Sequence, residues 1–397
     1  MSERHVCPEG NSHPSALRTG RLIFKSGQLD QGSFSREDLP SQCRNTMLSL
    51  RKSLENAGAS FADLVKLVVY YAGTAADEDR LLDLIAQDIG LDTRPVISLI
   101  NNPRMSDVGP SVKIDAVAMR APEGGTIDKQ TWHLDFMPYL PTAFSHVIKA
   151  DEMVFTSDVS ARTPHGDVAH PADLPEQTSL MMKRLIRLLK VAGADISDVV
   201  KVSTYYLGSG TAEDWAAAAT IRGAFFHDPG PAATGMPLSS FPHKGLETKI
   251  CATAIRASTP SQMPVPRQYS WPKGHGGWTE VLPYKHGNKC EGVIHLGGQV
   301  ALDSYANVLH PGDIVAQTQI AMDNVERVLH ELGAKLDNVV QVTTFYQIPV
   351  AEEALRESRR IQSKAWAGKG PALTEIPMDN LVYENMVIEI DVIAVLD

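Results

Sequence analysis

The chain has 397 residues, of which 43% are hydrophobic, and a formal net charge of −10 at pH 7. This length accommodates two to four domains of ordinary size, and the composition is typical of a soluble globular protein. The acidic balance, which no run of basic residues offsets, disfavours nucleic acid as a partner, because such binding rests on Lys and Arg that neutralise phosphates.

The cysteines and the apolar stretches indicate the cellular compartment in which we expect the protein. Four cysteines are widely scattered and form neither a CxxC pair nor a plausible disulfide framework, which favours a reducing compartment. The N-terminal sequence MSERHVCPEG lacks the apolar core of a signal peptide, and no segment approaches the roughly 18 apolar residues of a membrane-spanning helix. We therefore expect a cytoplasmic protein that does not contact membranes.

The first third of the chain predicts a strand at Leu22–Phe24, followed by a helix that opens at Gln42 and ends at Ala57-Gly58. Glycine is common just past a helix end because it adopts the left-handed backbone conformation found there. The β-branched and aromatic run that starts at Asp63, DLVKLVVYY, predicts a second strand. A second helix and a closing strand at Val112–Val117 complete the unit.

The same order of elements recurs twice. Gln177 and Gln317 open corresponding helices, and Gly193 and Gly333 end them, 135 and 140 residues after the preceding stop glycine. A period this long is a whole small domain rather than a solenoid unit of about 20 to 50 residues. The sequence therefore predicts three tandem domains, at 1–121, 122–258 and 259–397.

The third copy is the most regular. Its first strand breaks at Gly297-Gly298, which is typical of a strand that ends in a tight turn or bulge. Its predicted strands and helices alternate at 292–300, 317–332, 339–345, 350–366, around 374, and 387–396. We expect each copy to be a mixed sheet with two helices on one face, an α+β layer design.

Short motifs in the copies point to a known family. The third copy carries Pro283-Tyr284, Gly298-Gln299 and Gln317-Thr318, and the first carries Ser26-Gly27-Gln28. In these motifs and their order, the chain resembles the RidA/YjgF family of reactive-intermediate imine deaminases, in three tandem copies. The resemblance implies a chorismate-mutase-like fold in each copy. Members usually form homotrimers with sites in clefts between neighbours, so it also implies a pseudo-trimer within this one chain, present as a monomer or a dimer of pseudo-trimers.

The same resemblance implies an activity. Typical members hydrolyse 2-imino or 2-enamino acids to 2-keto acids and ammonia, in a cleft that needs neither a metal nor an organic cofactor. An arginine holds the substrate carboxylate bidentately, and an acidic residue of the closing strand positions water or shuttles a proton. A tyrosine near the start of the copy and the serine of Ser-Gly-Gln complete the pocket. We therefore expect an enzyme that hydrolyses C–N bonds of a small molecule.

The arginine and acid positions of the family differ among the copies. The arginine position falls on Arg94 in the first copy, but on Ala233 and Leu373 in the others, which cannot bind a carboxylate. The acid position falls, in chain order, on Asp115, Cys251 and Asp391. Because the first copy keeps both groups, we predict that Arg94 binds the substrate and that Asp115 is catalytic, with Asp391 as a second catalytic candidate.

The serine and tyrosine positions complete the predicted site. In chain order the serine position falls on Ser26, Ser157 and Gly297, and the tyrosine position falls on His13, Phe144 and Tyr284. We predict catalytic roles for Ser26 and Tyr284, and substrate binding by His13. Because the family's clefts lie between neighbours, Tyr284 can complete the cleft that carries Arg94.

Two other functions stay open. Single-chain triplicates of similar architecture include cyanuric acid hydrolase and barbiturase, which open cyclic amides, but their repeated Ser-Lys pairs are not visible here. The second is a non-catalytic binding or regulatory protein with degenerate clefts.

The glycine-rich stretch Lys273–Trp278 lacks the Gly-Lys-Ser/Thr of a phosphate loop, and we expect it to be a linker or a lid over a cleft.

Overall fold

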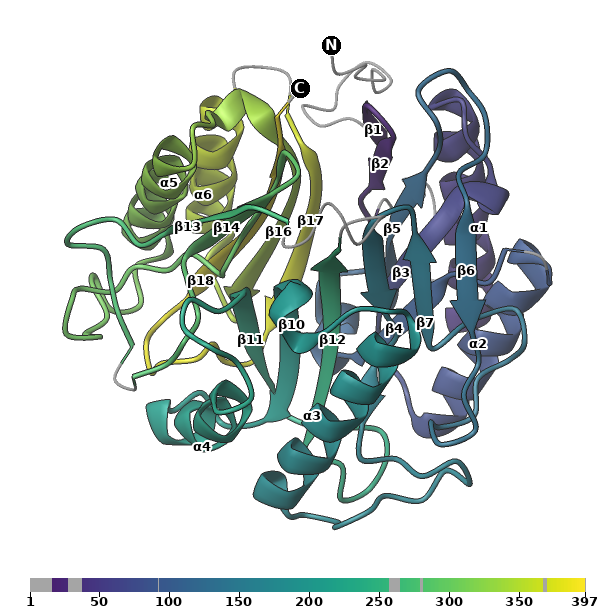
Figure 1. The fold of residues 1–397 in the computed structure, drawn as a ribbon. Coiled ribbons are helices and arrows are strands. Elements are labelled where there is room, and N and C mark those ends of the chain that lie inside the picture. Colours follow the sequence, from purple (N-terminus) through teal and green to yellow (C-terminus); the bar gives the residue numbers. More distant parts are fainter. Residues whose placement is uncertain are drawn as a thin grey trace.

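The computed structural model describes residues 16–27, 38–91, 93–256, 265–278, 281–366 and 370–396, and these form three mixed β-sheets with helices packed against them. Figure 1 shows the helices on the outside of the molecule and the three sheets turned toward its middle. Each sheet belongs to one repeat, which confirms the expected α+β fold in three tandem copies.

The elements of the three repeats follow the same order. The first repeat consists of β1 (Ala16–Thr19), β2 (Leu22–Lys25), α1 (Leu39–Asn56), β3 (Leu64–Tyr71), α2 (Ala75–Ile89), β4 (Val96–Asn101) and β5 (Val112–Met119). The second consists of β6 (Lys129–Trp132), β7 (Val147–Ala150), β8 (Met153–Thr156), β9 (Val159–Ser160), α3 (Leu174–Val191), β10 (Val199–Leu207), α4 (Ala212–Gly223), β11 (Ala232–Leu238) and β12 (Thr248–Ile255). The third consists of β13 (Arg267–Ser270), β14 (Gly287–Cys290), β15 (Val293–Leu296), α5 (Ile314–Glu331), β16 (Val339–Gln347), α6 (Glu352–Ala365), β17 (Ala372–Met378) and β18 (Ile388–Val395).

The closing strand of each repeat lies inside its sheet. β5 pairs with β2 and β3, β12 with β8 and β10, and β18 with β15 and β16, all antiparallel. The remaining long strand, β4, β11 or β17, pairs in parallel with β3, β10 or β16 and forms one edge of the sheet. Each edge strand is therefore free to face the next repeat.

The repeated glutamines join a helix to the loop that precedes the closing strand. Each long helix begins three residues before its glutamine, because Asp38, Asp173 or Asp313 caps the first turn through its carboxylate. The glutamine side chain is buried and accepts a hydrogen bond from a backbone N–H, at 2.8 Å for Gln42 and Gln177 and 2.9 Å for Gln317. The helices end as expected, at glycines with φ of 70° to 75°.

The hydrophobic core has parts within repeats and parts shared among them. Each repeat packs its helices against the outer face of its own sheet. A shared cluster joins Phe24 of the first repeat, Phe155 of the second and Val293 of the third. Full burial of such a side chain contributes about 1.5 to 3 kcal/mol, so this cluster ties the repeats into one unit. Across the described parts of the chain, no helix has the length and apolar character needed to cross a bilayer.

Hydrogen bonds between repeats close a ring. Asp158 of the second repeat donates from its N–H to the Ile97 carbonyl oxygen of the first, at 3.3 Å. Gly298 of the third repeat donates from its N–H to the Ala233 carbonyl oxygen of the second, at 3.2 Å. Gly27 of the first repeat donates to Thr374 Oγ1 of the third, at 3.0 Å. Each edge strand thus lies against the turn that follows the first strand pair of the next repeat.

Candidate active site

The three inter-repeat clefts can be compared position by position, because the strand pairing is the same in each repeat. Tyr70, Tyr205 and Phe345 lie opposite Lys113, Lys249 and Glu389 respectively on the closing strands. These three closing-strand residues are therefore equivalent, and each projects toward the preceding repeat's edge strand. Their different chemistry makes the three clefts different.

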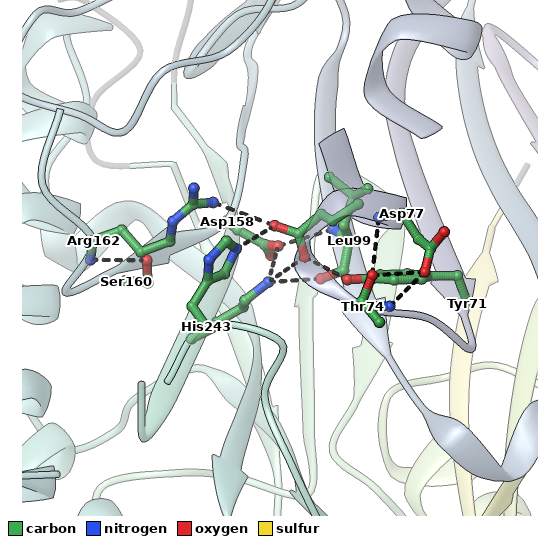
Figure 2. A network of polar contacts seen from close by, with 10 residues as sticks. Tyr71, Thr74, Asp77, Leu99, Asp158, Ser160, Arg162 and His243 are labelled. Atoms are coloured by element: carbon green, nitrogen blue, oxygen red, sulfur yellow. Dashed lines mark hydrogen bonds and ion pairs between the residues drawn. The ribbon is translucent and has the colours of Figure 1, made fainter. Parts of the chain in front are cut away.

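In the cleft between the first and second repeats, ion pairs fill the space. Glu78 of α2 is buried and accepts hydrogen bonds from Tyr71 Oη at 2.6 Å and from His243 Nε2 at 2.9 Å. It also pairs with Arg162 at 3.3 Å and with Lys249 at 3.7 Å. Figure 2 shows Tyr71, Arg162 and His243 converging on this point. Although burial opposes ionisation, Lys249, His243 and Tyr71 together lower the pKa of Glu78 to about 2.

Inter-repeat hydrogen bonds occupy the cleft between the third and first repeats. Lys113 Nζ donates to the Glu375 carbonyl oxygen. Asp115 Oδ1 accepts from Thr374 Oγ1 at 2.5 Å and from Gly27 N at 2.6 Å. Burial raises the pKa of Asp115, and these two hydrogen bonds oppose the rise. Lys113 and the Asp115 carboxylate are therefore both hydrogen-bonded in this cleft.

The cleft between the second and third repeats holds a cavity of about 50 Å³, which we call the Glu389 cavity. It is lined by Trp215, Arg222, Ala233, Gly235, Trp278, Tyr284, Gly298, Val300, Leu302, Val382, Tyr383, Met386 and Glu389. The lining is thus mainly apolar and aromatic, with one acid and one strong base. Cavities of this composition are typical of small-molecule sites.

Glu389 is a buried carboxyl group, with 4% of its surface exposed. Burial, and after it the negative charge of Asp391, raises the pKa of Glu389 to about 8, while Lys201 opposes the rise. Among the described residues, the Glu389 carboxyl forms neither a hydrogen bond nor an ion pair. Its carboxyl is therefore neutral at pH 7 and has a proton to give, which is the property required of a general acid.

A missing side chain makes room for this carboxyl group. A Cβ atom on Gly298 would lie 1.6 Å from Glu389 Oε1, so no other residue fits at position 298 while Glu389 keeps its place. The turn at Gly297-Gly298, which the sequence marks as a break in a strand, thus shapes the cavity.

Arg222 supplies the positive charge of the cavity. It lies near the end of α4 and is 2% exposed, and its Nε donates to Tyr284 Oη at 2.9 Å. The guanidinium carbon also lies 5.5 Å from the centre of the Tyr284 ring. In the part of the chain that the structure describes, Arg222 forms no ion pair with a carboxylate. A buried guanidinium without a counter-charge is costly, and an anionic ligand would relieve that cost.

Aromatic side chains form the remaining wall. Trp278 lies 6.3 Å from Trp215 between ring centroids, and Trp215 lies 6.2 Å from Tyr383. The indole N–H of Trp278 is buried and has no partner among the described residues. Trp278 ends the glycine-rich stretch that the sequence predicts as a linker or lid, and its ring lines the cavity. His286 holds this stretch in place, because its Nε2 contacts the Gly276 carbonyl oxygen at 2.9 Å.

The predicted site residues do not come together in one place. Tyr284 lies in the Glu389 cavity, beside Arg222 of the preceding repeat. Asp391 forms an ion pair with Lys201 at 2.8 Å, and Asp115 and Ser26 lie at the junction of the third and first repeats. Ser26 is buried, and its Oγ has no partner within the described residues. His13 lies outside the described residues.

Arg94 is not at the position that the motif comparison assigns to it. The strand pairing places Ile97, not Arg94, in register with Ala233 and Leu373. Arg94 precedes β4 with φ of 45°, its side chain is exposed, and its Nε donates to the Leu91 carbonyl oxygen at 3.2 Å. The structure therefore corrects the predicted grouping of Arg94 with Asp115 and Ser26, since Arg94 does not contact either.

Sequence reasoning missed two residues of the cavity. Glu389 and Asp391 are the two acids of one strand, and the motif was matched to the second of them. Arg222 lies in a helix that no motif marks, and its signal is a single basic residue at the end of the alanine-rich run AEDWAAAATIRG. Both could have been found only by knowing which strand and helix face the same cleft.

The fold defines a class of proteins with three tandem RidA-like α+β units, here with a cavity that holds one acid and one base between the second and third units. A profile of the family described as Endoribonuclease L-PSP matches the chain three times, at residues 7–120, 137–256 and 279–396. The chain belongs to this family, which includes the RidA/YjgF proteins that it resembles.

Individual relatives cover either one repeat or nearly the whole chain. A RutC family protein of Pyrococcus abyssi (strain GE5 / Orsay) is 27% identical over 114 residues, which are 29% of this chain and 87% of that protein. RidA from the Antarctic bacterium Psychrobacter sp. PAMC 21119 is 20% identical, with 32% of this chain and 98% of that one covered and a TM-score of 0.28. A chorismatase is 12% identical, with 94% of this chain and 98% of that one covered and a TM-score of 0.59. The chorismatase thus shares the fold over almost the full length.

Proposed function

We propose that the protein hydrolyses small imine or enamine carboxylates, releasing a 2-keto acid and ammonia, in the Glu389 cavity. Family membership supports a small-molecule function of this kind. The observation that carries the proposal is the pairing, in one cavity, of a neutral buried carboxyl group with a buried guanidinium that lacks a counter-charge.

The two groups suit the two ends of a 2-enamino acid. Arg222, held by Tyr284, binds the substrate carboxylate. Glu389 donates its proton to the terminal carbon of the C=C bond, and the nitrogen lone pair forms the C=N bond of a 2-iminium acid. Water then adds to C2, one of its protons passes to the nitrogen so that the C–N bond breaks and ammonia leaves, and its other proton returns to Glu389 as the C2 carbonyl forms. Enamine and water are converted to 2-keto acid and ammonia, and the enzyme is unchanged.

The size of the cavity favours a small substrate. A volume of about 50 Å³ holds roughly four water molecules, at about 10 to 15 Å³ each by this measure. A three-carbon enamino acid displaces about that number of waters. A substrate with a ring would require Trp278 and its loop to move.

A second candidate is the hydrolysis of an enol ether carboxylate. The same proton donation to a C=C bond would start it, with an alcohol leaving in place of ammonia. The aromatic wall of Trp215, Trp278 and Tyr383 favours a substrate with a ring. One structure similar over nearly the whole chain is a chorismatase, and chorismate carries an enol ether next to a carboxylate. The lining includes neither serine nor lysine, so it does not favour the opening of cyclic amides.

The test compares two substrates that would both release pyruvate. The full chain is incubated with 2-aminoacrylate, generated in the assay by an auxiliary lyase, or with chorismate, and pyruvate is measured. We expect acceleration over the spontaneous hydrolysis of 2-aminoacrylate. Acceleration with chorismate alone would select the second candidate, and no acceleration with either would refute the placement of an enzyme site in this cavity. Because the ring closes within one chain, we also propose that the active form is a monomer or a dimer.

A further inference from the structure

A second cavity lies where the three sheets meet, and its lining comes from all three repeats. Its volume is about 100 Å³, roughly twice that of the Glu389 cavity. Phe24, Phe155, Val117 and Ile393 give it an apolar part. Lys66, Lys201, Asp115, Asp391, Cys251 and His295 give it a polar part. We call this cavity the central chamber.

The polar part of the central chamber follows the threefold repeat of the sequence. The strand pairing makes Lys66, Lys201 and Gln341 equivalent, because they lie opposite Val117, Thr253 and Ile393. It likewise makes Asp115, Cys251 and Asp391 equivalent, opposite Val68, Ser203 and Thr343. Lys66 and Lys201 are each directed toward the member of the second set in the next repeat, which is Cys251 for Lys66 and Asp391 for Lys201.

One of these inter-repeat pairs has lost its negative partner. Lys201 of the second repeat pairs with Asp391 of the third at 2.8 Å. At the equivalent place, Lys66 of the first repeat meets Cys251 of the second, with Nζ 3.9 Å from Sγ. Among the described residues, Lys66 forms no ion pair. The chamber therefore holds a lysine ammonium group in the geometry of an ion pair, but without the carboxylate.

A second observation indicates a ligand at the same place. His295 lines the chamber, is 3% exposed, and has an Nδ1 atom with no partner in the described part of the chain. Burial, and after it the charges of Lys201 and Lys66, lowers the pKa of His295 to about 3, so the ring is neutral and can accept or donate one hydrogen bond. Lys66 itself is partly exposed, so the chamber can be reached from solvent.

We propose that the central chamber is a second small-molecule site, which binds a monocarboxylate with a flat apolar body through Lys66. The carboxylate takes the place of the missing acid at position 251 and pairs with the Lys66 ammonium group. The apolar body lies among Phe24, Phe155 and Val117. A chamber of about 100 Å³ is smaller than the apolar cavity of about 150 Å³ that binds benzene, so the apolar body of the ligand is no larger than one benzene ring.

The probe is benzoate, and its binding to the full chain is measured by titration calorimetry at pH 7. Lys66→Met keeps the apolar stem but removes the charge, and we expect it to weaken binding by about 10- to 100-fold, as the loss of a charge-assisted contact does. Lys66→Arg is the matched control that retains the charge and should bind benzoate within a few-fold of the wild type. Arg222→Met removes the cation of the Glu389 cavity and should leave benzoate binding in the chamber unchanged.

A substitution at the partner position tests the same idea without removing the lysine. Cys251→Asp should restore the ion pair seen between Lys201 and Asp391, occupy the Lys66 ammonium group and abolish benzoate binding in a folded protein. A crystal soaked with 4-iodobenzoate should place iodine in the central chamber. The inference is overturned if Lys66→Met or Cys251→Asp binds benzoate as the wild type does, or if iodine lies in the Glu389 cavity alone. These outcomes do not depend on the catalytic activity.

Discussion

Replacement of Glu389 by glutamine should remove activity and at the same time stabilise the protein at neutral and alkaline pH. Burial keeps the proton on Glu389, and its pKa rises from 4.5 to about 8 on folding. A carboxyl group with a raised pKa costs no stability below the unfolded pKa. It costs progressively more as the pH rises, because the unfolded chain ionises first. Glutamine has nearly the same shape but never ionises, so it does not incur this cost.

The magnitude follows from the shift. Each pKa unit corresponds to about 1.36 kcal/mol, so the cost at pH 7 is about 3 kcal/mol, and it approaches about 5 kcal/mol above pH 8. The free energy of unfolding of Glu389→Gln, relative to wild type, should therefore increase by about 3 kcal/mol between pH 4 and pH 7. Any fixed cost of burying the amide is the same at both pH values and cancels from this change.

The assay is urea unfolding of both proteins at pH 4, 5.5, 7 and 8.5, together with the rate of pyruvate formation at each pH. Glu353→Gln, at an exposed position of α6, is the control and should show no pH-dependent difference. The wild-type rate should fall as the pH rises through about 8, because the general acid loses its proton. A stability difference that stays constant with pH would refute a buried, neutral Glu389. A Glu389→Gln variant with full activity would refute its role as the acid.

Six further substitutions, at five positions, separate the clefts. Arg222→Met should raise the KM for a carboxylate substrate about 10- to 100-fold, and Arg222→Lys should recover only part of the lost affinity, because lysine lacks the bidentate fork. A KM of Arg222→Met equal to that of the wild type would place the substrate carboxylate elsewhere. Gly298→Ala should displace the Glu389 carboxyl and lower kcat by about 100-fold or more, whereas Gly27→Ala, at the equivalent position of another cleft, should leave kcat unchanged. Glu78→Gln should lower the free energy of unfolding by about 3 to 5 kcal/mol at pH 7 but not kcat, because it leaves the Arg162 guanidinium without an ion pair and removes one of the two carboxylates that pair with Lys249, in a cleft to which we assign no catalytic role. Since the pKa of Glu78 is lowered to about 2 in the folded protein, the stabilisation by its carboxylate should be fully present above pH 4.5 and disappear as the pH falls toward 2. If Glu78→Gln lowered the free energy of unfolding at pH 7 by less than about 1 kcal/mol, the stabilising role of the ion pairs around Glu78 would be contradicted. Arg94→Ala should change neither kcat nor KM, and a large effect on either would restore Arg94 to the site.

The fold could be predicted from the sequence because its signals are local and repeated. Apolar periodicity, the stop glycines and the β-branched runs each depend on neighbouring residues, and they agree in three copies. The sequence pattern predicts the helix starts three residues late, because it marks the glutamines as the openings. The true start is set by the capping carboxylates of Asp38, Asp173 and Asp313, which lie just outside the apolar pattern.

The site could be predicted only in part, and strand geometry explains why the motif points to Asp391 rather than to Glu389. Side chains two residues apart on a strand point to the same face, so Glu389 and Asp391 give the same alternating pattern. Only the packing shows that Glu389 reaches the cleft while Asp391 pairs with Lys201. Tyr284 was predicted as a residue that completes a neighbour's cleft, and it lies in a cleft with Arg222 of the second repeat. The partner Arg94, which the motif comparison favoured, is exposed instead.

The equivalent residues Lys113, Lys249 and Glu389 explain why one cleft of three is a candidate for catalysis. Each lysine reaches across its cleft to a backbone carbonyl oxygen of the preceding repeat, at Glu375 for Lys113 and at Leu99 for Lys249. A lysine at this position thus acts as a cross-link between repeats and occupies the space that a substrate would need. Glu389 keeps its proton at pH 7, but it makes no such bond among the described residues. The cleft that gives up this inter-repeat hydrogen bond therefore retains both the space and the proton that hydrolysis requires.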